Sequence, residues 1–194
     1  MKTTNKLIQT LNYIAFHSPN KRIGFKKAYK LLWLMDRYSL RHYARTISGD
    51  KYFAMQLGPV PTDAKHILEG VPTNMVHNPQ DADNYLSINL SYHKFGSRKA
   101  PDMDVFSVSD VKVMDLILER YGHLRSNDLS VLSHEFPEWK AYKDKIENDK
   151  EKNSFPIDTH LFFEVYDDGT GVFDDDARML SIAKDMWNEY NAVV

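Results

Sequence analysis

The sequence contains no cysteine among its 194 residues. This absence excludes disulfide bonds, thiolate metal sites and thiol catalysis, and it suits a reducing cytoplasm, which is the location we expect. No stretch approaches the ~18 to 20 uninterrupted apolar residues of a membrane-spanning helix. The first residues, MKTTNKLIQTLNYIAFHS, have neither a long apolar run nor a cleavage pattern, so we expect no signal peptide.

Common motifs of enzymes and metal proteins are also missing. There is no GxSxG elbow, P-loop or GxGxxG motif, and none of the eight histidines lies in a zinc-binding spacing. We therefore expect a protein that is not an enzyme and that uses no metal or cofactor. A hydrolase built around His134 and Asp36 is an alternative, because catalytic groups can converge from distant positions; it requires the two residues to share a pocket.

Charge is distributed unevenly along the chain. The net charge is −2, but residues 1–70 carry a balance of +8, residues 71–150 carry −3 and residues 151–194 carry −7. This gradient indicates either a basic face for an anionic partner or two ends of the chain that attract each other.

Hydrophobic periodicity predicts a mostly helical protein. Apolar residues recur at helical spacing over residues 4–17, 25–45, 110–121 and the C-terminal segment, and shorter helices are expected after Pro61, near residue 126 and from Pro137. Residues 52–56 and 85–90 are predicted strands that pair with each other. The predicted fold class is mainly α: a compact multi-helix domain with one small antiparallel β-hairpin or sheet.

The segment Gly58-Pro59-Val60-Pro61 separates a predicted strand from a predicted helix. Pro59 and Pro61 lack amide donors, so we expect no sheet ladder to continue through them. Pro61 suits the first turn of the following helix, which we expect to end at Gly70. Gly49 is the expected left-handed residue after the long helix.

Several cations share one face of the long helix at 25–45. Lys26, Lys30, Arg37 and Arg41 fall within about 60° of one another on a helical wheel, and Trp33 borders them. This basic stripe has three interpretations: a solvated face or docking site for the acidic C-terminal helix, a protein interface, or a phosphate-binding surface. The domain as a whole is not basic, which disfavours nucleic acid.

Two blocks of the sequence together resemble the Panacea antitoxin domain family, which is also called SocA-like and is associated with bacteria and phages. The first block, KAYKLLWLMDRYSLRHYARTISGDKYFAMQLGPVP, contains a Lys-Leu-Leu-aromatic-Leu-x-Asp helix, a Gly-Asp turn, an aromatic strand and a Gly-Pro-Val turn. The second, SDVKVMDLILERYGHLRSNDLSVLSHEFPEW, ends at His134 and Trp139. The resemblance covers roughly residues 5–145.

The resemblance implies an antitoxin that neutralises a cognate toxin by binding it directly. We expect the antitoxin-like domain at 1–150 and, beyond the segment that the resemblance covers, an acidic C-terminal helical extension at 151–194 that packs on the same domain. The motif residues would be scaffold, with Asp36 anchoring the long helix to the Gly-Pro-Val-Pro turn through backbone amides. These residues are Asp36, Gly49, Asp50, Gly58, Pro59, Pro61, His134 and Trp139.

We predict that the toxin contacts the basic stripe and the acidic C-terminal helix. The predicted contact residues are Lys26, Lys30, Trp33, Arg37, Arg41, Asp174, Asp175 and Asp176. Alternative functions are an adaptor that delivers the toxin to a protease such as a Clp-type unfoldase, and a DNA-binding autorepressor that uses the basic helix. No membrane partner is expected, and the sequence does not indicate an oligomeric state.

Overall fold

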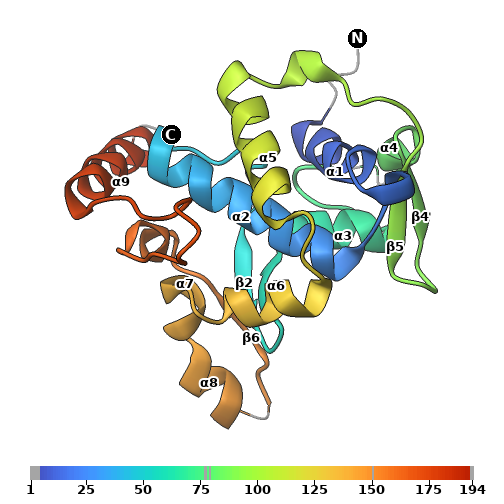
Figure 1. Ribbon diagram of the computed structural model, residues 1–194. Coiled ribbons are helices and arrows are strands. Elements are labelled where there is room, and N and C mark those ends of the chain that lie inside the picture. Colours follow the sequence, from blue (N-terminus) through green and yellow to red (C-terminus); the bar gives the residue numbers. More distant parts are fainter. Residues whose placement is uncertain (1–4, 77, 79, 150, 193–194) are drawn as a thin grey trace.

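The computed structural model describes residues 5–76, 78, 80–149 and 151–192. Helix α2 (Phe25–Tyr43) passes through the middle of the molecule, and helices and strands from both halves of the chain contact it (Figure 1). Its contacts include α1, α3, α5, α6, α9, β1 and β3. Because these elements surround α2, polar as well as apolar side chains of this helix are buried.

The predicted helices and the two predicted strands are present, with shifts at their ends, whereas α4, β1, β3 and β6 were not predicted. The helices are α1 (Lys6–Phe16), α3 (Thr62–Glu69), α4 (Gln80–Asp83), α5 (Val108–Tyr121), α6 (Ser126–Ser133), α7 (Pro137–Lys140), α8 (Lys143–Asn148) and α9 (Ala177–Ala192). Short 3₁₀ turns are η1 (Pro19–Lys21), η2 (Met103–Val105) and η3 (Thr159–Phe163). The strands are β1 (Arg22–Gly24), β2 (Tyr52–Met55), β3 (Gly58–Pro61), β4 (Leu86–Asn89), β5 (Lys94–Ser97) and β6 (Ser154–Pro156).

The mainly α fold class is confirmed, but the strands form two sheets in the described residues. Each is antiparallel and three-stranded, with orders β1-β5-β4 and β3-β2-β6. The predicted pairing of residues 52–56 with 85–90 is therefore wrong. Strand β4 pairs with β5 after a short turn, whereas β2 takes β6, about 100 residues later, as its outer neighbour. Pairing with β5 closes only a short loop and therefore costs little chain entropy, which favours this local partner for β4.

The Gly-Pro-Val-Pro segment forms strand β3, so the prediction that the ladder stops before the prolines is also wrong. Thr62 donates its amide to the Lys51 carbonyl at 2.9 Å. Donors alternate along an antiparallel strand, so Val60 and Gly58 take the other donating positions and the prolines do not. Two prolines spaced by two residues are thus tolerated on an edge strand.

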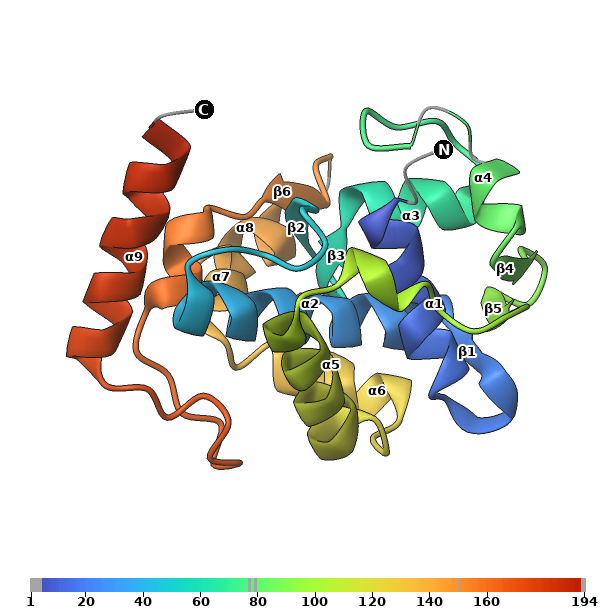
Figure 2. The same ribbon diagram turned by 90° about the horizontal axis from the view of Figure 1, so that it is seen from above.

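The end of the chain completes the same hydrophobic core. Phe162, Phe163, Val172 and Phe173 are buried in the cluster that contains the apolar residues of α1 and α2. Viewed from above, α9 stands at one edge of the molecule, opposite the edge that carries β4 and β5 (Figure 2). No helix among the described residues has the length and apolarity to cross a membrane.

The helix ends have the expected capping chemistry. Ser107 and Asp110 form a reciprocal capping box at the start of α5. Helix α3 ends at Gly70 with φ of 74°, also as predicted. Gly49 is left-handed at φ 75°, but Ala44 is the residue that ends α2 in this conformation.

Gly58 offers a direct test of this packing. Its φ is +96°, and a Cβ there would overlap Ser133 Oγ and lie 2.7 Å from Lys30 Nζ. We expect Gly58→Ala to lower the free energy of unfolding by about 2–4 kcal/mol through overpacking and backbone strain. The measurement is urea denaturation.

Gly70→Ala is the matched control. Its φ of +74° carries similar backbone strain, but no atom lies within 4 Å of the added Cβ. We expect a loss of about 1 kcal/mol, from strain alone. Equal losses in the two variants would contradict the close packing of β3 against α6.

Candidate protein-binding groove

The predicted basic stripe on α2 is not exposed. Lys30, Trp33, Arg37 and Arg41 are all buried, with no more than 2% of any side chain exposed. Only Lys26 is partly exposed, and it donates to Asn127 Oδ1 at 3.0 Å. The prediction that these four residues contact a partner is corrected for this reason: other parts of the same chain already cover them.

Lys30 holds the strand that follows the long helix. Its Nζ donates to the Pro59 carbonyl at 2.7 Å, and both groups are buried. Burial, and then repulsion from Lys26, hold the pKa of Lys30 well below its usual value. A cation this far from water is tolerated where its donors find fixed acceptors.

Arg37 and Trp33 both bind a carboxylate that the sequence analysis did not single out as a site. Glu138 Oε1 accepts from Trp33 Nε1 at 3.1 Å and from Arg37 Nε at 2.9 Å, with both charged side chains fully buried. The guanidinium carbon lies 4.7 Å from the ring centres of both Phe136 and Phe173. Glu138 is about 100 residues from α2, so no local pattern could reveal this pairing.

Arg41 binds the segment that leads into α9. It forms an ion pair with Asp175 at 2.6 Å and donates to the carbonyls of Phe162 and Glu164 at 3.0 and 2.8 Å. His42 lies 3.0 Å from the other Asp175 oxygen. The interpretation of the stripe as a docking site for the acidic C-terminal segment therefore holds at this position. Burial, and then repulsion from Arg37, lower the pKa of Arg41 to about 10.

The three aspartates before α9 have different environments. Asp175 is largely covered by its ion pairs, so the predicted partner contact is corrected for it as well. Asp174 and Asp176 are exposed. Asp176 accepts the amides of Arg178 and Met179 at 2.8 and 2.9 Å, which caps the start of α9.

Asp36 anchors α2 through backbone amides, but at a different turn from the one expected. It is fully buried and accepts from the amides of Ile47 and Ser48 at 2.8 and 2.9 Å. It also accepts from the Ser48 hydroxyl and from Tyr52 Oη, the latter at 2.6 Å. Burial raises the pKa of Asp36, against the effect of these hydrogen bonds. The residue that reaches the Gly-Pro-Val-Pro segment is Lys30.

Other motif residues also join elements to one another. Asp50 accepts the amides of Thr62, Asp63 and Ala64, which begin α3. His134 stacks on Trp139 with 3.9 Å between ring centres, and Trp139 Nε1 donates to the Met55 carbonyl at 2.8 Å.

The contacts of His134 do not overlap with those of Asp36, and neither residue lines the groove described next. These contacts of the described residues give no support to the hydrolase alternative, which requires the two residues to share a pocket. The autorepressor alternative loses its basis too, because it depended on an exposed basic helix.

A groove of about 630 Å³ lies between the end of α2 and α9. Residues 43–49 form one wall, and Lys6 lies at its edge. Met186, Trp187, Tyr190 and Asn191 of α9 form the other wall. Asp36 fixes the first wall through Ile47 and Ser48, and Arg41 fixes the start of α9 through Asp175. Two buried polar residues of α2 thus set the positions of both walls.

Four large apolar side chains of α9 are exposed, and two of them, Met186 and Tyr190, line this groove. They form what we call the apolar row: Met179 (56% exposed), Ile182 (47%), Met186 (55%) and Tyr190 (67%). Tyr43, on the opposite wall, is also exposed. The buried contacts of the same helix use Leu180 and Ala183. The sequence predicted α9 as amphipathic but could not show that a second apolar face would lack a cover.

The buried charges and the open apolar groove together indicate the class of protein. The charged motif residues are occupied in holding its own elements together, and the open groove is flanked by apolar side chains, a pattern typical of protein-binding modules. A family model described as "Antitoxin SocA-like, Panacea domain" matches residues 29–140, more than half of the chain, and the protein belongs to this family. No curated protein and no solved structure matches the chain.

The anchoring role of Asp36 can be tested with Asp36→Asn. The amide keeps the size of the side chain but places a donor among four donors, which leaves buried groups without acceptors. We expect the free energy of unfolding to fall by about 2–4 kcal/mol, measured by urea denaturation. Unchanged stability would contradict the role of Asp36 as an anchor.

The ion pairs of Asp175 predict a specific acid sensitivity. Burial alone would raise its pKa, but the bonds from His42 and Arg41 lower it to about 2, below the ordinary 3.8. The folded protein therefore binds fewer protons at this site than the unfolded chain between these values. The stabilisation is complete above about pH 4 and is lost as the pH falls toward 2.

Asp175→Asn isolates this contribution. At pH 7 we expect it to cost about 1–3 kcal/mol, because Arg41 loses its charged partner. The difference in unfolding free energy between wild type and variant should shrink as the pH is lowered from 4 to 2. A difference that is constant over this range would show that Asp175 gains no stability from ionisation.

Proposed function

We propose that this protein is an antitoxin that neutralises a cognate protein toxin by binding it directly at the groove between residues 43–49 and α9. Membership of the SocA-like family supports an antitoxin-type role and a toxin as the partner in general. The observation that carries the proposed surface is the apolar row beside the groove. Exposed apolar surface of this kind gains free energy when a partner removes it from water.

The proposed mechanism is steric and involves no turnover. Lys30, Arg41 and Asp36 form hydrogen bonds with groups of their own chain, and Arg37 does so through Nε, so these residues stiffen the frame and leave the outer surface to contact the partner. A preorganised frame loses little conformational entropy when it binds, which favours affinity for a fixed area.

Co-expression with the product of the adjacent reading frame is the direct test. Wild-type protein should restore growth, and the purified pair should bind. Met186→Asp should abolish rescue and weaken the Kd at least tenfold, because a charge enters the apolar contact. Persistent toxicity despite soluble wild-type protein would contradict the proposed function.

Val108→Asp is the matched control for this test. Val108 is 74% exposed at the start of α5, where an added carboxylate suits the helix N-terminus. It should neutralise as well as wild type, and both variants should keep the wild-type melting temperature. A pulse-chase of the toxin separates steric neutralisation, in which its half-life is unchanged or longer, from delivery to a Clp-type protease, in which it is shorter.

A further inference from the structure

The apolar row has the geometry of a helix–helix contact. Its members are spaced by three, four and four residues, which places them on one narrow face of α9. From Met179 to Tyr190 the row is about 16 Å long, the length of three helical turns. This spacing resembles the seam of paired helices, in which the side chains of one helix fill holes in the other. Two methionines make the seam adaptable in shape.

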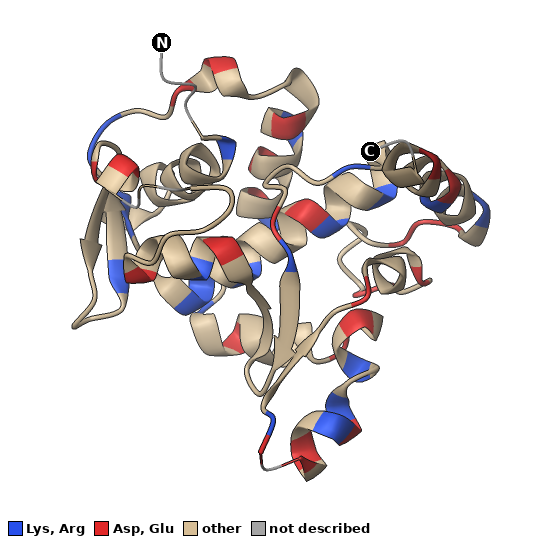
Figure 3. Cartoon of the chain, turned by 180° about the vertical axis from the view of Figure 1, so that it is seen from behind, with Lys and Arg blue, Asp and Glu red and all other residues tan. Residues whose placement is uncertain are grey.

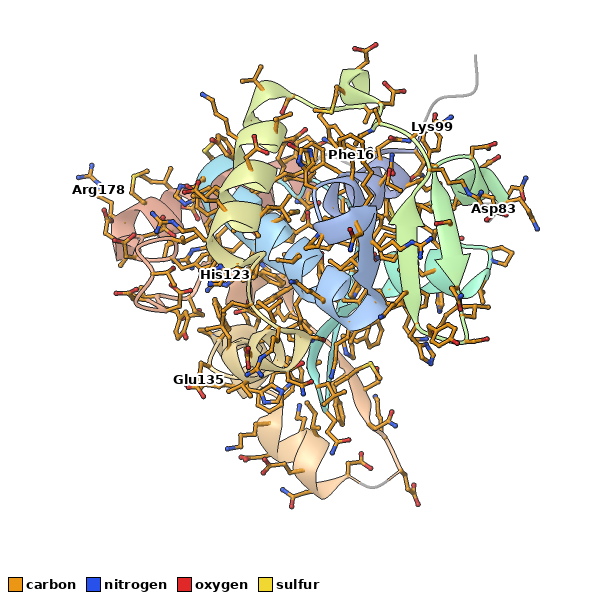
Figure 4. The ribbon with its side chains drawn as sticks, turned by 45° about the vertical axis from the view of Figure 1, so that its right-hand side comes forward. Phe16, Asp83, Lys99, His123, Glu135 and Arg178 are labelled. Atoms are coloured by element: carbon orange, nitrogen blue, oxygen red, sulfur yellow. The ribbon has the colours of Figure 1, made fainter. Side chains whose placement is uncertain are left out.

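One border of the row is acidic. Asp185 and Glu189 lie on the side of α9 that faces away from the body of the protein, and both are exposed. No ion pair engages either carboxylate within the described part of the chain. The nearest cation on this border is Arg178, near the first turn, and its side chain extends away from the molecule (Figure 4). Figure 3 shows charged residues of both signs along this helix.

The apolar row and the acidic border beside it together favour one kind of binding partner. We propose that α9 docks an amphipathic α-helix of the partner protein, with apolar side chains at three- and four-residue spacing and Lys or Arg along the border that meets Asp185 and Glu189. This inference rests on the proposed function, because it names the part of the toxin that the antitoxin would cover. The basic residues of that helix would also meet the negative C-terminal end of α9.

Other occupants fit this surface less well. An extended strand gains its affinity by pairing with an open sheet edge, and a helix offers none because its backbone bonds are internal. A second copy of this chain, paired about a two-fold axis through the middle of the row, would bring the two Asp185 carboxylates together. Like charges at a contact are unfavourable. A basic helix from another protein meets neither obstacle.

A double charge reversal, Asp185→Lys with Glu189→Lys, tests the proposed border. The Kd for the adjacent-frame product, measured by calorimetry at 50 mM salt, should rise at least tenfold. Binding by wild type should weaken with added salt, and the variant should lose or reverse this dependence, because its two lysines repel the basic partner and salt screens that repulsion. The row itself is unchanged in this variant, so residual apolar binding is expected at high salt.

Glu119→Lys with Glu147→Lys is the matched control. It makes the same change in net charge at exposed positions of α5 and α8. Its Kd should equal that of wild type. Equal weakening in both double variants would show a dependence on net charge only and would overturn the proposed border.

Hydrogen exchange on the complex identifies the occupant. We expect α9 and one helical segment of the partner, rich in Lys or Arg, to gain protection together. Protection of a partner strand, or a free antitoxin that sediments as a dimer which Met186→Asp dissociates, would overturn the inference. If Met186→Asp loses neutralisation as proposed but the double charge reversal neutralises as well as wild type, this inference fails and the proposed function stands; if wild type neither binds nor neutralises, the proposed function itself fails.

Discussion

Three cations buried along one helix set the arrangement of the rest of the molecule. A charge removed from water must find fixed acceptors, and those that bind these three cations lie outside α2. Lys30 finds the Pro59 carbonyl, Arg37 finds Glu138, and Arg41 finds Asp175 and two carbonyls of the preceding segment. These acceptors come from three distant parts of the chain, so satisfying the cations brings β3, α7 and the start of α9 to α2.

This arrangement separates the residues that hold the frame from the surface that is left open. The motif that gives the family its character lies inside, where each charge is engaged, and it has little surface left for a partner. The groove lies at the edge of the frame: its wall of residues 43–49 belongs to the matched segment of 29–140, whereas the α9 wall, which carries the apolar row, lies beyond that segment. One internal frame can therefore carry different outer surfaces, because substitutions at the exposed positions of α9 do not alter its buried contacts through Leu180 and Ala183.

The structure departs from the sequence-based predictions most clearly at α2 and β3. Hydrophobic periodicity predicted the position of helix α2 well. A helical wheel suggests that a charged face is exposed to solvent, but here other elements cover that face. The two prolines were expected to end the sheet, but their spacing matches the alternation of an antiparallel ladder. Asp36 was expected to anchor the Gly-Pro-Val-Pro turn by accepting hydrogen bonds from backbone amides. It does accept from backbone amides, but from those of Ile47 and Ser48 in the turn that follows α2.

The sequence by itself determined what is local: the positions of the longer helices, the left-handed Gly49 and Gly70, and the family through two ordered blocks. Tertiary structure alone decided which charges are buried, which strands pair, and which face of α9 stays open. The physical reason is the distance along the sequence over which each kind of interaction acts. Capping and periodicity act over a few residues, whereas the partners of Arg37 and Arg41 lie more than 100 positions away, where only the packed chain brings them together.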